Sequence, residues 1–315
     1  MLLHMLNLKK NLRLSRRDPA PTNDSDDAEF LLSGLIEKIS TDDIQEIYLN
    51  HQGVLSCLRT DGYRSNLGDF CSTSEVMDLA WKIAWDSGVR LDPFCPFAGG
   101  IVKGRNLRWH AVIPPAAPDG PMLVVRKQSL FEVSLTEFKL ENFSECDILR
   151  WQQTGVSVVF FGPTGCGKTT LLFSLLKRHF LEFRVGIVES VMELPLASPA
   201  WFRLVQVGQD LGGKGAIDFE RIVAEMLRLS PQLIVLGEIR GAEAYVWSEL
   251  SRTGHGGILT TFHAGSTAEA RSRLYENVRL SPSTGPTVIG VHVFRDHLGT
   301  YRCRSELISS CSSPI

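Results

Sequence analysis

The run Gly162-Pro-Thr-Gly-Cys-Gly-Lys-Thr169 constrains the fold of this chain more than any other feature. A glycine, four residues and then Gly-Lys-Thr is the spacing of a phosphate-binding loop between a strand and a helix. The apolar run Val156–Phe161 before it indicates a buried strand, and Thr170–Lys177 after it indicates a helix. Glycines let backbone N–H groups face an anion, and the helix N-terminus adds partial positive charge. We therefore expect Lys168 to reach terminal phosphates and the Thr169 hydroxyl to bind Mg²⁺.

The composition is that of an ordinary globular protein, with 43% hydrophobic and 22% charged residues, and 315 residues allow two domains. Lys and Arg number 33 against 35 Asp and Glu, so the net charge of −2 argues against a nucleic-acid partner. The seven cysteines are scattered, which indicates neither disulfides nor a zinc site and fits a reducing cytoplasm. No apolar run reaches the roughly 20 residues of an integral membrane segment.

Hydrophobic patterning divides the chain into four parts. Residues 1–29 are first basic and then polar and acidic, which indicates a disordered or amphipathic leader. Residues 30–127 mix helical and strand patterns and predict an α+β domain, and residues 128–147 predict a linker. In residues 148–310, apolar strands alternate with helices. The predicted fold class is therefore α/β, with a mostly parallel sheet covered on both faces and preceded by a smaller α+β domain.

Three glutamates are candidates for the chemistry that a phosphate loop alone does not supply, because hydrolysis needs a carboxylate to orient the attacking water. Glu238 follows the apolar strand Leu233–Leu236, at the edge where the ligands of α/β sheets bind. Glu189 ends another predicted strand and points to the same edge, and Glu193 follows four residues later. Either of these two could bind Mg²⁺ through water or polarise the nucleophile.

Two histidines and one arginine lie near the same edge. His255 precedes a predicted strand, and His263 ends it. A neutral imidazole there could sense the terminal phosphate, although a lone histidine in a turn is usually structural. Arg240 lies two residues beyond Glu238 and could pair with an acidic group or a phosphate.

Four motifs then appear in the order that is typical of the type II/IV secretion and pilus-assembly ATPases, and the chain resembles that family over residues 30 to 280. They are the phosphate loop, an acidic box at Ile187–Glu193, a Walker B motif at Pro231–Gly241 and a histidine box at Thr253–His263. The N-terminal runs Ala111–Pro115 and Asp119–Lys127 are similar to those of the tight-adherence (Flp) pilus branch.

The resemblance implies a RecA-like ATPase domain, a homohexameric ring, and ATP bound with Mg²⁺ between the two domains of one subunit. It also implies a cytoplasmic motor that acts peripherally at the bacterial inner membrane. There, hydrolysis would rotate the N-terminal domain, turn an inner-membrane platform protein and so power pilus assembly or protein secretion.

By motif position, the resemblance makes Glu238 the catalytic Walker B glutamate and adds Glu189, Glu193, His255 and His263 as catalytic candidates. The residues that it assigns to nucleotide binding are Gly162, Pro163, Thr164, Gly165, Cys166, Gly167, Lys168, Thr169, Thr170, Arg108, Arg126 and Arg240. The residues that it assigns to Mg²⁺ are Thr169 and Glu189.

Some positions depart from the family pattern. The substitutions are Ser190 for Asp in the acidic box, Ser230 for Arg and Gln232 for Asp around the Walker B motif, and Val102 for an arginine of the N-terminal domain. Only about two dozen residues separate His263 from the strand predicted at Thr287, where the family usually has a longer helical segment.

Two alternative functions stay open. A divergent paralogue could bind nucleotide and regulate another motor with little hydrolysis, which the substitution at Ser190 and the short C-terminal segment favour. A nucleic-acid-translocating P-loop ATPase fits the net charge less well. Tight ATP binding without turnover would indicate the first, and turnover stimulated by single-stranded DNA would indicate the second.

Overall fold

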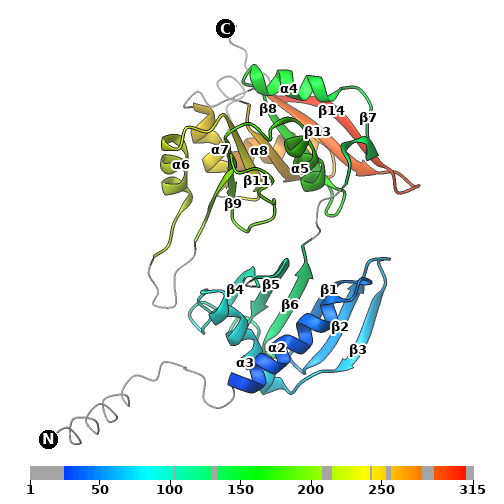
Figure 1. The fold of residues 1–315 in the computed structure, drawn as a ribbon, viewed down its shortest axis with the longest axis vertical. Helices are drawn as coiled ribbons and strands as arrows, with labels where there is room; N and C mark the ends of the chain where they lie inside the picture. The colour runs from blue at the N-terminus through cyan, green and yellow to red at the C-terminus, as the bar shows by residue number, and fades with distance from the viewer. Residues whose placement is uncertain are drawn as a thin grey trace, which may run out of the picture. The chain divides into compact units, whose positions relative to one another are not determined.

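The computed structural model describes residues 25–102, 104–128, 133–207, 215–241, 243–252, 257–278 and 287–309. The chain divides into two compact units between Lys127 and Gln128. Each unit has its own sheet and its own buried apolar clusters (Figure 1). The leader predicted for residues 1–29 lies mostly outside the described residues, although the first described helix begins at Ser25.

The first unit is a six-stranded antiparallel sheet whose strands lie in the order β3-β2-β1-β6-β5-β4. Its elements are α2 (Ser25–Ser40), β1 (Ile44–Leu49), β2 (Val54–Arg59), β3 (Arg64–Asp69), α3 (Thr73–Asp86), β4 (Phe97–Ile101), β5 (Leu107–Val112) and β6 (Met122–Lys127). The two helices share one buried cluster with alternate residues of the strands, so they cover one face of the sheet.

Local sequence explains the helical layer of this unit. A capping box starts α3, because the Ser72 side chain accepts from the backbone of Glu75 and the Glu75 carboxylate accepts from Ser72 N–H. Trp109 on β5 is almost fully buried, and its indole N–H donates to Ser87 Oγ at 2.9 Å just beyond α3. This bond satisfies the one polar group of a large buried side chain.

The second unit contains an eight-stranded sheet in the order β10-β9-β11-β12-β8-β13-β14-β7. Its strands are β7 (Phe138–Leu140), β8 (Ser157–Gly162), β9 (Val185–Glu189), β10 (Phe202–Val205), β11 (Leu233–Ile239), β12 (Leu259–His263), β13 (Val288–Arg295) and β14 (Tyr301–Ser309). From β10 to β13 all neighbours run parallel, so the carboxyl ends of six strands meet at one edge. Strand β14 forms an antiparallel hairpin with β13 and pairs in parallel with β7.

Helices cover both faces of this sheet. They are a 3₁₀ turn η1 (Leu135–Glu137), α4 (Glu145–Gln153), α5 (Lys168–His179), α6 (Phe219–Arg228), α7 (Glu243–Arg252) and α8 (Thr267–Val278). Phe160 on β8 packs in the cluster that contains α4 and α5, and the next residue, Phe161, packs in the cluster of α6, α7 and α8. Successive strand residues point to opposite faces, so this fully buried strand joins the two cores.

The predicted fold class is confirmed, since a mostly parallel sheet covered on both faces follows a smaller α+β unit. The segment predicted to be a linker, residues 128–147, contains a strand: β7 joins the edge of the second sheet, with Phe138 opposite Tyr301. Three residues are too few to show strand periodicity, so the sequence pattern did not indicate β7. The edge strands β3, β4 and β10 were also not predicted, because polar residues and glycines interrupt the apolar pattern of β3 and β4, and β10 has only four residues.

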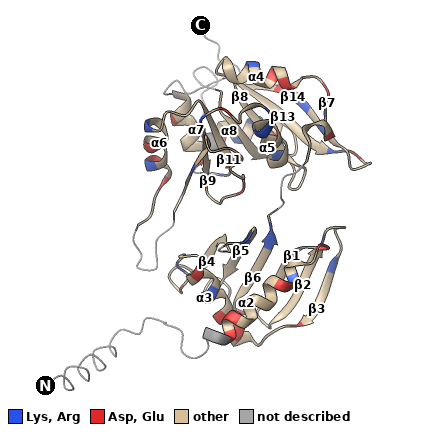
Figure 2. Ribbon diagram, viewed as in Figure 1, with Lys and Arg blue, Asp and Glu red and all other residues tan. Residues whose placement is uncertain are grey.

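Among the described residues, no helix combines the length and the apolar character that a membrane crossing requires. Basic and acidic residues are both scattered over the two units, and no described element carries a continuous basic stripe (Figure 2). This distribution agrees with the near-neutral total charge.

Replacing Phe160 with alanine should strongly destabilise the protein. Its side chain is fully buried between the parallel strands and α5, so the substitution leaves a cavity, and the free energy of unfolding should fall by about 3–5 kcal/mol. Urea denaturation followed by far-UV circular dichroism measures this change. The control Leu298→Ala, at a side chain that is 77% exposed, should change stability by less than about 0.5 kcal/mol. A loss below about 1 kcal/mol for Phe160→Ala would contradict the packing described.

Candidate functional site

The phosphate loop leaves the carboxyl end of β8 through a space that only glycine fits. A Cβ atom added to Gly162 would lie 2.1 Å from the carbonyl oxygen of Val293 on the neighbouring strand β13. Gly167 has a left-handed φ of 99°, and a Cβ atom there would lie 2.6 Å from the ring of Tyr301. Gly162 and Gly167 are therefore required by close packing against β13 and β14 as well as by the turn itself.

Gly167 is the N-cap residue of helix α5, and no side-chain hydrogen bond caps the first turn of this helix. The first backbone N–H groups of a helix need partners from outside the helix, and together with the helix dipole they form an anion-binding end. Thr169 and Thr170 lie in this first turn and are half-buried, whereas Pro163, Thr164 and Gly165 of the loop are exposed. The end of the helix thus matches the phosphate site that the motif predicts.

Lys168 is the charged residue of the loop, and only 6% of its surface is exposed. Its ammonium group donates to the carbonyl oxygens of Gly162 at 3.0 Å and Pro163 at 2.9 Å, and lies 3.2 Å from Nδ1 of His263. Burial lowers the pKa of Lys168, and the charges of nearby glutamates, Glu238 among them, oppose this decrease. The ammonium is thus held inside the loop by acceptors of the protein.

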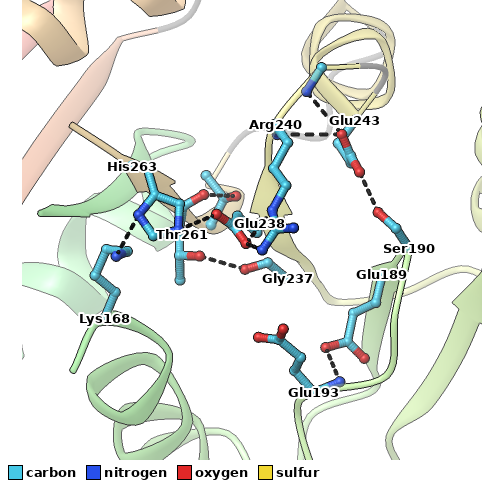
Figure 3. A network of polar contacts seen from close by, with 12 residues as sticks. Lys168, Glu189, Ser190, Glu193, Gly237, Glu238, Arg240, Glu243, Thr261 and His263 are labelled. Atoms are coloured by element: carbon cyan, nitrogen blue, oxygen red, sulfur yellow. Dashed lines mark hydrogen bonds and ion pairs between the residues drawn. The ribbon is translucent and has the colours of Figure 1, made fainter. Parts of the chain in front are cut away.

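His263 links Lys168 to Glu238 (Figure 3). It ends β12 beside Gly162, and its Nε2 lies 2.7 Å from Oε1 of Glu238. Burial lowers the pKa of His263, while the charge of Glu238 opposes this decrease. A neutral ring that accepts from Lys168 on Nδ1 carries its proton on Nε2, facing the carboxylate.

Glu238 lies near the end of β11, where the pairing with β12 changes register between Leu236 and Ile239. Its side chain is 15% exposed, and Arg240 holds its Oε2 with two nitrogens, Nε at 2.7 Å and Nη2 at 2.6 Å. This bond and the adjacent charge raise the pKa of Arg240. Glu238 is therefore fixed between a guanidinium and an imidazole while part of its surface faces solvent.

Glu189 lies at the end of β9 in a different environment, with only 2% of its side chain exposed. One oxygen accepts from the backbone N–H groups of Glu193 at 3.0 Å and Leu194 at 2.9 Å, and the other lies 2.8 Å from Nε of Arg203. Burial raises the pKa of Glu189, while the Leu194 N–H and the charge of Arg203 oppose this increase. One oxygen thus holds the loop that follows β9, and the other faces Arg203 on β10.

Ser190, the substituted position of the acidic box, has a definite partner. Its hydroxyl donates to one carboxylate oxygen of the buried Glu243, at the start of α7. The other oxygen of Glu243 accepts from the backbone N–H groups of Gly241 at 3.1 Å and Arg240 at 3.4 Å. Ser190 therefore helps to fix the turn that positions Arg240, where an aspartate would place a second carboxylate against Glu243.

The structure brings most of the predicted residues to one edge of the second sheet. These are the loop from Gly162 to Thr170, with Glu189, Glu193, Glu238, Arg240 and His263 (Figure 3). Arg108 and Arg126 belong to the first unit, where they face each other directly on β5 and β6. His255 lies outside the described residues. The catalytic, nucleotide and Mg²⁺ roles of these residues stay predictions.

Sequence reasoning missed Arg203 and Glu243, the two residues that hold the acidic loop and the Arg240 turn. Arg203 is on the edge strand β10, whose pattern is too short to show that it lies beside β9. Glu243 in the first turn of a predicted helix fits the general preference of acidic residues for that place. That preference would have marked it as a helix-end residue and not as the partner of Ser190.

Replacing Arg203 with alanine should destabilise the second unit in a pH-dependent way. The change leaves a buried carboxylate without its cation, so the free energy of unfolding should fall by about 3 kcal/mol at pH 7. Arg203 opposes the increase that burial causes in the pKa of Glu189, so its removal should raise this pKa further in the folded variant. The folded variant then binds more protons relative to its unfolded chain than wild type does, and its stability falls more steeply as the pH rises above the ordinary carboxyl pKa. The loss should therefore be smaller at pH 5 than at pH 7.

Denaturation of Arg203→Ala at both pH values tests this, and the double variant Arg203→Ala/Glu189→Gln is the matched control. The double variant lacks the carboxylate that Arg203 neutralises. Its loss of stability relative to wild type should therefore change less between pH 5 and pH 7 than the loss of Arg203→Ala does. Equal losses for Arg203→Ala at pH 5 and pH 7 would show that the ion pair with Glu189 does not carry the effect.

Known proteins resemble this chain over most of its length. The family model described as type II/IV secretion system protein matches residues 101–283, which is more than half of the chain. A Mycobacterium tuberculosis protein named for conjugal transfer is 29% identical over 261 residues, covering 77% of this chain and 74% of that protein. The type IV secretion system protein PtlH of Bordetella pertussis is 27% identical over 283 residues, covering 82% and 83%.

The fold agrees as well. The ATPase DotB of Legionella pneumophila has a TM-score of 0.63 to this structure at 17% identity, covering 88% of this chain and 80% of that one. The finer assignment to the tight-adherence pilus branch stays a prediction. From the matched family model, the ordered motifs and their meeting at one sheet edge, we conclude that this chain belongs to the type II/IV secretion ATPase family.

Proposed function

We propose that this protein is a Mg²⁺-dependent ATPase that powers pilus assembly or protein secretion across the bacterial inner membrane. The observation that carries the proposal is the line of contacts from Lys168 through His263 and Glu238 to Arg240, at the open end of an uncapped helix. It places a phosphate-binding ammonium at the start of α5, directly after β8, and an oriented carboxylate on β11, with His263 on the intervening strand β12. Phosphoryl transfer to water requires both groups at one edge of the sheet.

The residues present fit ATP and Mg²⁺. The first turn of α5 has no side-chain cap, and the N–H groups there suit the phosphates, while the half-buried Thr169 suits the metal. When bound, Mg²⁺ would neutralise the charge that develops on the phosphate oxygens. One oxygen of Glu189 accepts from two loop N–H groups and the other faces Arg203, so its surroundings favour a contact with the ion through water.

Lys168 would exchange partners when nucleotide binds. The carbonyl oxygens of Gly162 and Pro163 and the ring of His263 are neutral acceptors, and a phosphate oxygen is a stronger, charged one. Once Lys168 turns to a phosphate, Nδ1 of His263 loses its donor. His263 then stays attached to Glu238 alone, which couples occupancy of the phosphate site to the catalytic carboxylate.

Glu238 would orient the attacking water and accept its proton. Arg240 and His263 hold its two oxygens in place, and its partial exposure leaves a path for water. The acidic-box substitution does not interrupt this arrangement, because Ser190 stabilises the turn of Arg240 through Glu243. This contact favours an active enzyme over the alternative of a nucleotide-binding paralogue with little hydrolysis.

We further propose that the active form is a homohexamer in the cytoplasm. It would bind peripherally to an inner-membrane platform protein of a tight-adherence type system, and ATP hydrolysis would rotate its N-terminal domain. The motifs of both units and the secretion-system relatives support this proposal. Arg108 and Arg126, paired on adjacent strands of the first unit, would supply positive charge to the phosphates. The mixed charge of the described elements argues against nucleic acid as cargo (Figure 2).

The wild-type protein should hydrolyse ATP with Mg²⁺, and Glu238→Gln should reduce turnover at least about a hundredfold, because it removes the proton acceptor. ATP affinity of this variant should stay within a few-fold of wild type, since Lys168 and the loop are intact. Steady-state phosphate release and isothermal titration calorimetry measure the two quantities. Glu306→Gln, at an exposed carboxylate on β14, is the control and should turn over like wild type.

Rapid turnover by Glu238→Gln would refute the role of this glutamate. A wild-type protein that binds ATP tightly but releases no phosphate would instead identify a nucleotide-binding regulator. Turnover stimulated by single-stranded DNA, with salt-sensitive binding, would identify a nucleic-acid translocase.

A further inference from the structure

The hairpin of β13 and β14 lies on the side of the phosphate loop opposite His263. Strand β8 has β12 as one neighbour and β13 as the other, and both run parallel to it. The carboxyl end of β12 carries His263, whereas the carboxyl end of β13 carries Arg295. The two residues therefore lie on opposite sides of the loop that joins β8 to α5.

The hairpin contacts the loop through Tyr301. The ring of Tyr301 packs so closely on Gly167 that a Cβ atom added there would lie 2.6 Å from it. The same ring packs against Phe138, with ring centroids 4.7 Å apart. The guanidinium of Arg295 lies over the same ring, 4.4 Å from its centroid, and donates to the Tyr301 hydroxyl. Arg295 and Tyr301 thus form a pair beside the start of α5, which we call the Arg295–Tyr301 pair.

The turn of the hairpin holds this pair in position. Asp296 Oδ1 accepts from the N–H groups of Leu298 and Thr300, both at 3.0 Å, and its Oδ2 accepts from Arg302 at 2.9 Å. Gly299 has a left-handed φ of 80°, which the turn requires. Arg295 directly precedes Asp296 in the sequence, so the bonds of Asp296 also restrict the backbone at Arg295.

Arg295 differs from the other arginines of the hairpin. Arg302 is paired with Asp296 and with Glu141, and Arg304 is paired with Glu141 at 2.8 Å. Arg295 is exposed, and among the described residues it has no ion pair with a carboxylate. Burial raises the pKa of the Cys166 thiol in the loop, and the charges of Lys168 and then Arg295 oppose this increase, which agrees with a guanidinium close to the loop.

The orientation of the nucleotide follows from the proposed catalytic residues. If hydrolysis takes place at Glu238 and His263, the terminal phosphate lies on the β12 side of the loop. The ribose and base are at the other end of the triphosphate and so extend away from β12. The Arg295–Tyr301 pair lies on that other side, with a planar cation and an aromatic ring available.

We propose that the Arg295–Tyr301 pair binds the nucleoside end of ATP, with the Arg295 guanidinium in contact with the base. This proposal rests on the nucleotide-binding function proposed above. A guanidinium is planar and weakly hydrated, so it stacks on an aromatic base as well as on Tyr301. A contact of this kind adds affinity for the whole nucleotide and none for its phosphates alone.

The test compares two ligands, MgATP and Mg-bound inorganic triphosphate, by isothermal titration calorimetry on the full chain. Arg295→Ala should weaken ATP binding about tenfold, in the range of a stacked cation contact, and leave triphosphate binding within about twofold. Arg295→Lys should lose about as much as alanine, because lysine keeps the charge and lacks the plane. Arg304→Ala, an arginine of the same hairpin held by Glu141, is the matched control and should bind both ligands like wild type.

Circular dichroism spectra equal to wild type would confirm that the variants fold. Equal weakening of ATP and triphosphate binding by Arg295→Ala would show that Arg295 binds phosphate and would overturn the proposal. If Arg295→Ala bound both ligands like wild type, the Arg295–Tyr301 pair would have a structural role only, and this result would also overturn the proposal. Failure of the wild-type protein to bind ATP at all would refute the proposed function itself, which separates the two failures.

Discussion

The buried ammonium group of Lys168 is the constraint on which the site depends. A charge that is almost entirely enclosed must find acceptors, and the fold supplies two carbonyl oxygens of its own loop and one imidazole from the next strand. Those acceptors are available because β8 and β12 run side by side, which places Gly162 opposite His263. The position of Lys168 therefore fixes the histidine, and the histidine in turn contacts Glu238.

Two glutamates at the same sheet edge have different surroundings. Glu189 is enclosed, accepts two backbone N–H groups and faces Arg203, so it stabilises the loop after β9. Glu238 is partly exposed and is held by two side chains, Arg240 and His263. The difference in burial explains why Glu238 is better suited to meet a water molecule and Glu189 to hold structure.

Much of this could be predicted from the sequence, because the decisive signals are local. The phosphate loop, the apolar strands around it and the order of the motifs indicated the parallel sheet and the shared edge of Glu189, Glu238 and His263. Contacts between distant segments could not be predicted in this way. The bond of Ser190 to Glu243 depends on how α7 starts, and the contact of Tyr301 with Gly167 depends on the register of β14 and on β7, a three-residue strand.

A structure of the protein with a non-hydrolysable ATP analogue and Mg²⁺ tests the central claim most directly. We predict that the Lys168 ammonium leaves Nδ1 of His263 and binds a terminal phosphate oxygen, while Glu238 stays in contact with His263 and faces that phosphate. A bound nucleotide with Lys168 still held by Gly162, Pro163 and His263, or with its terminal phosphate far from Glu238, would contradict it.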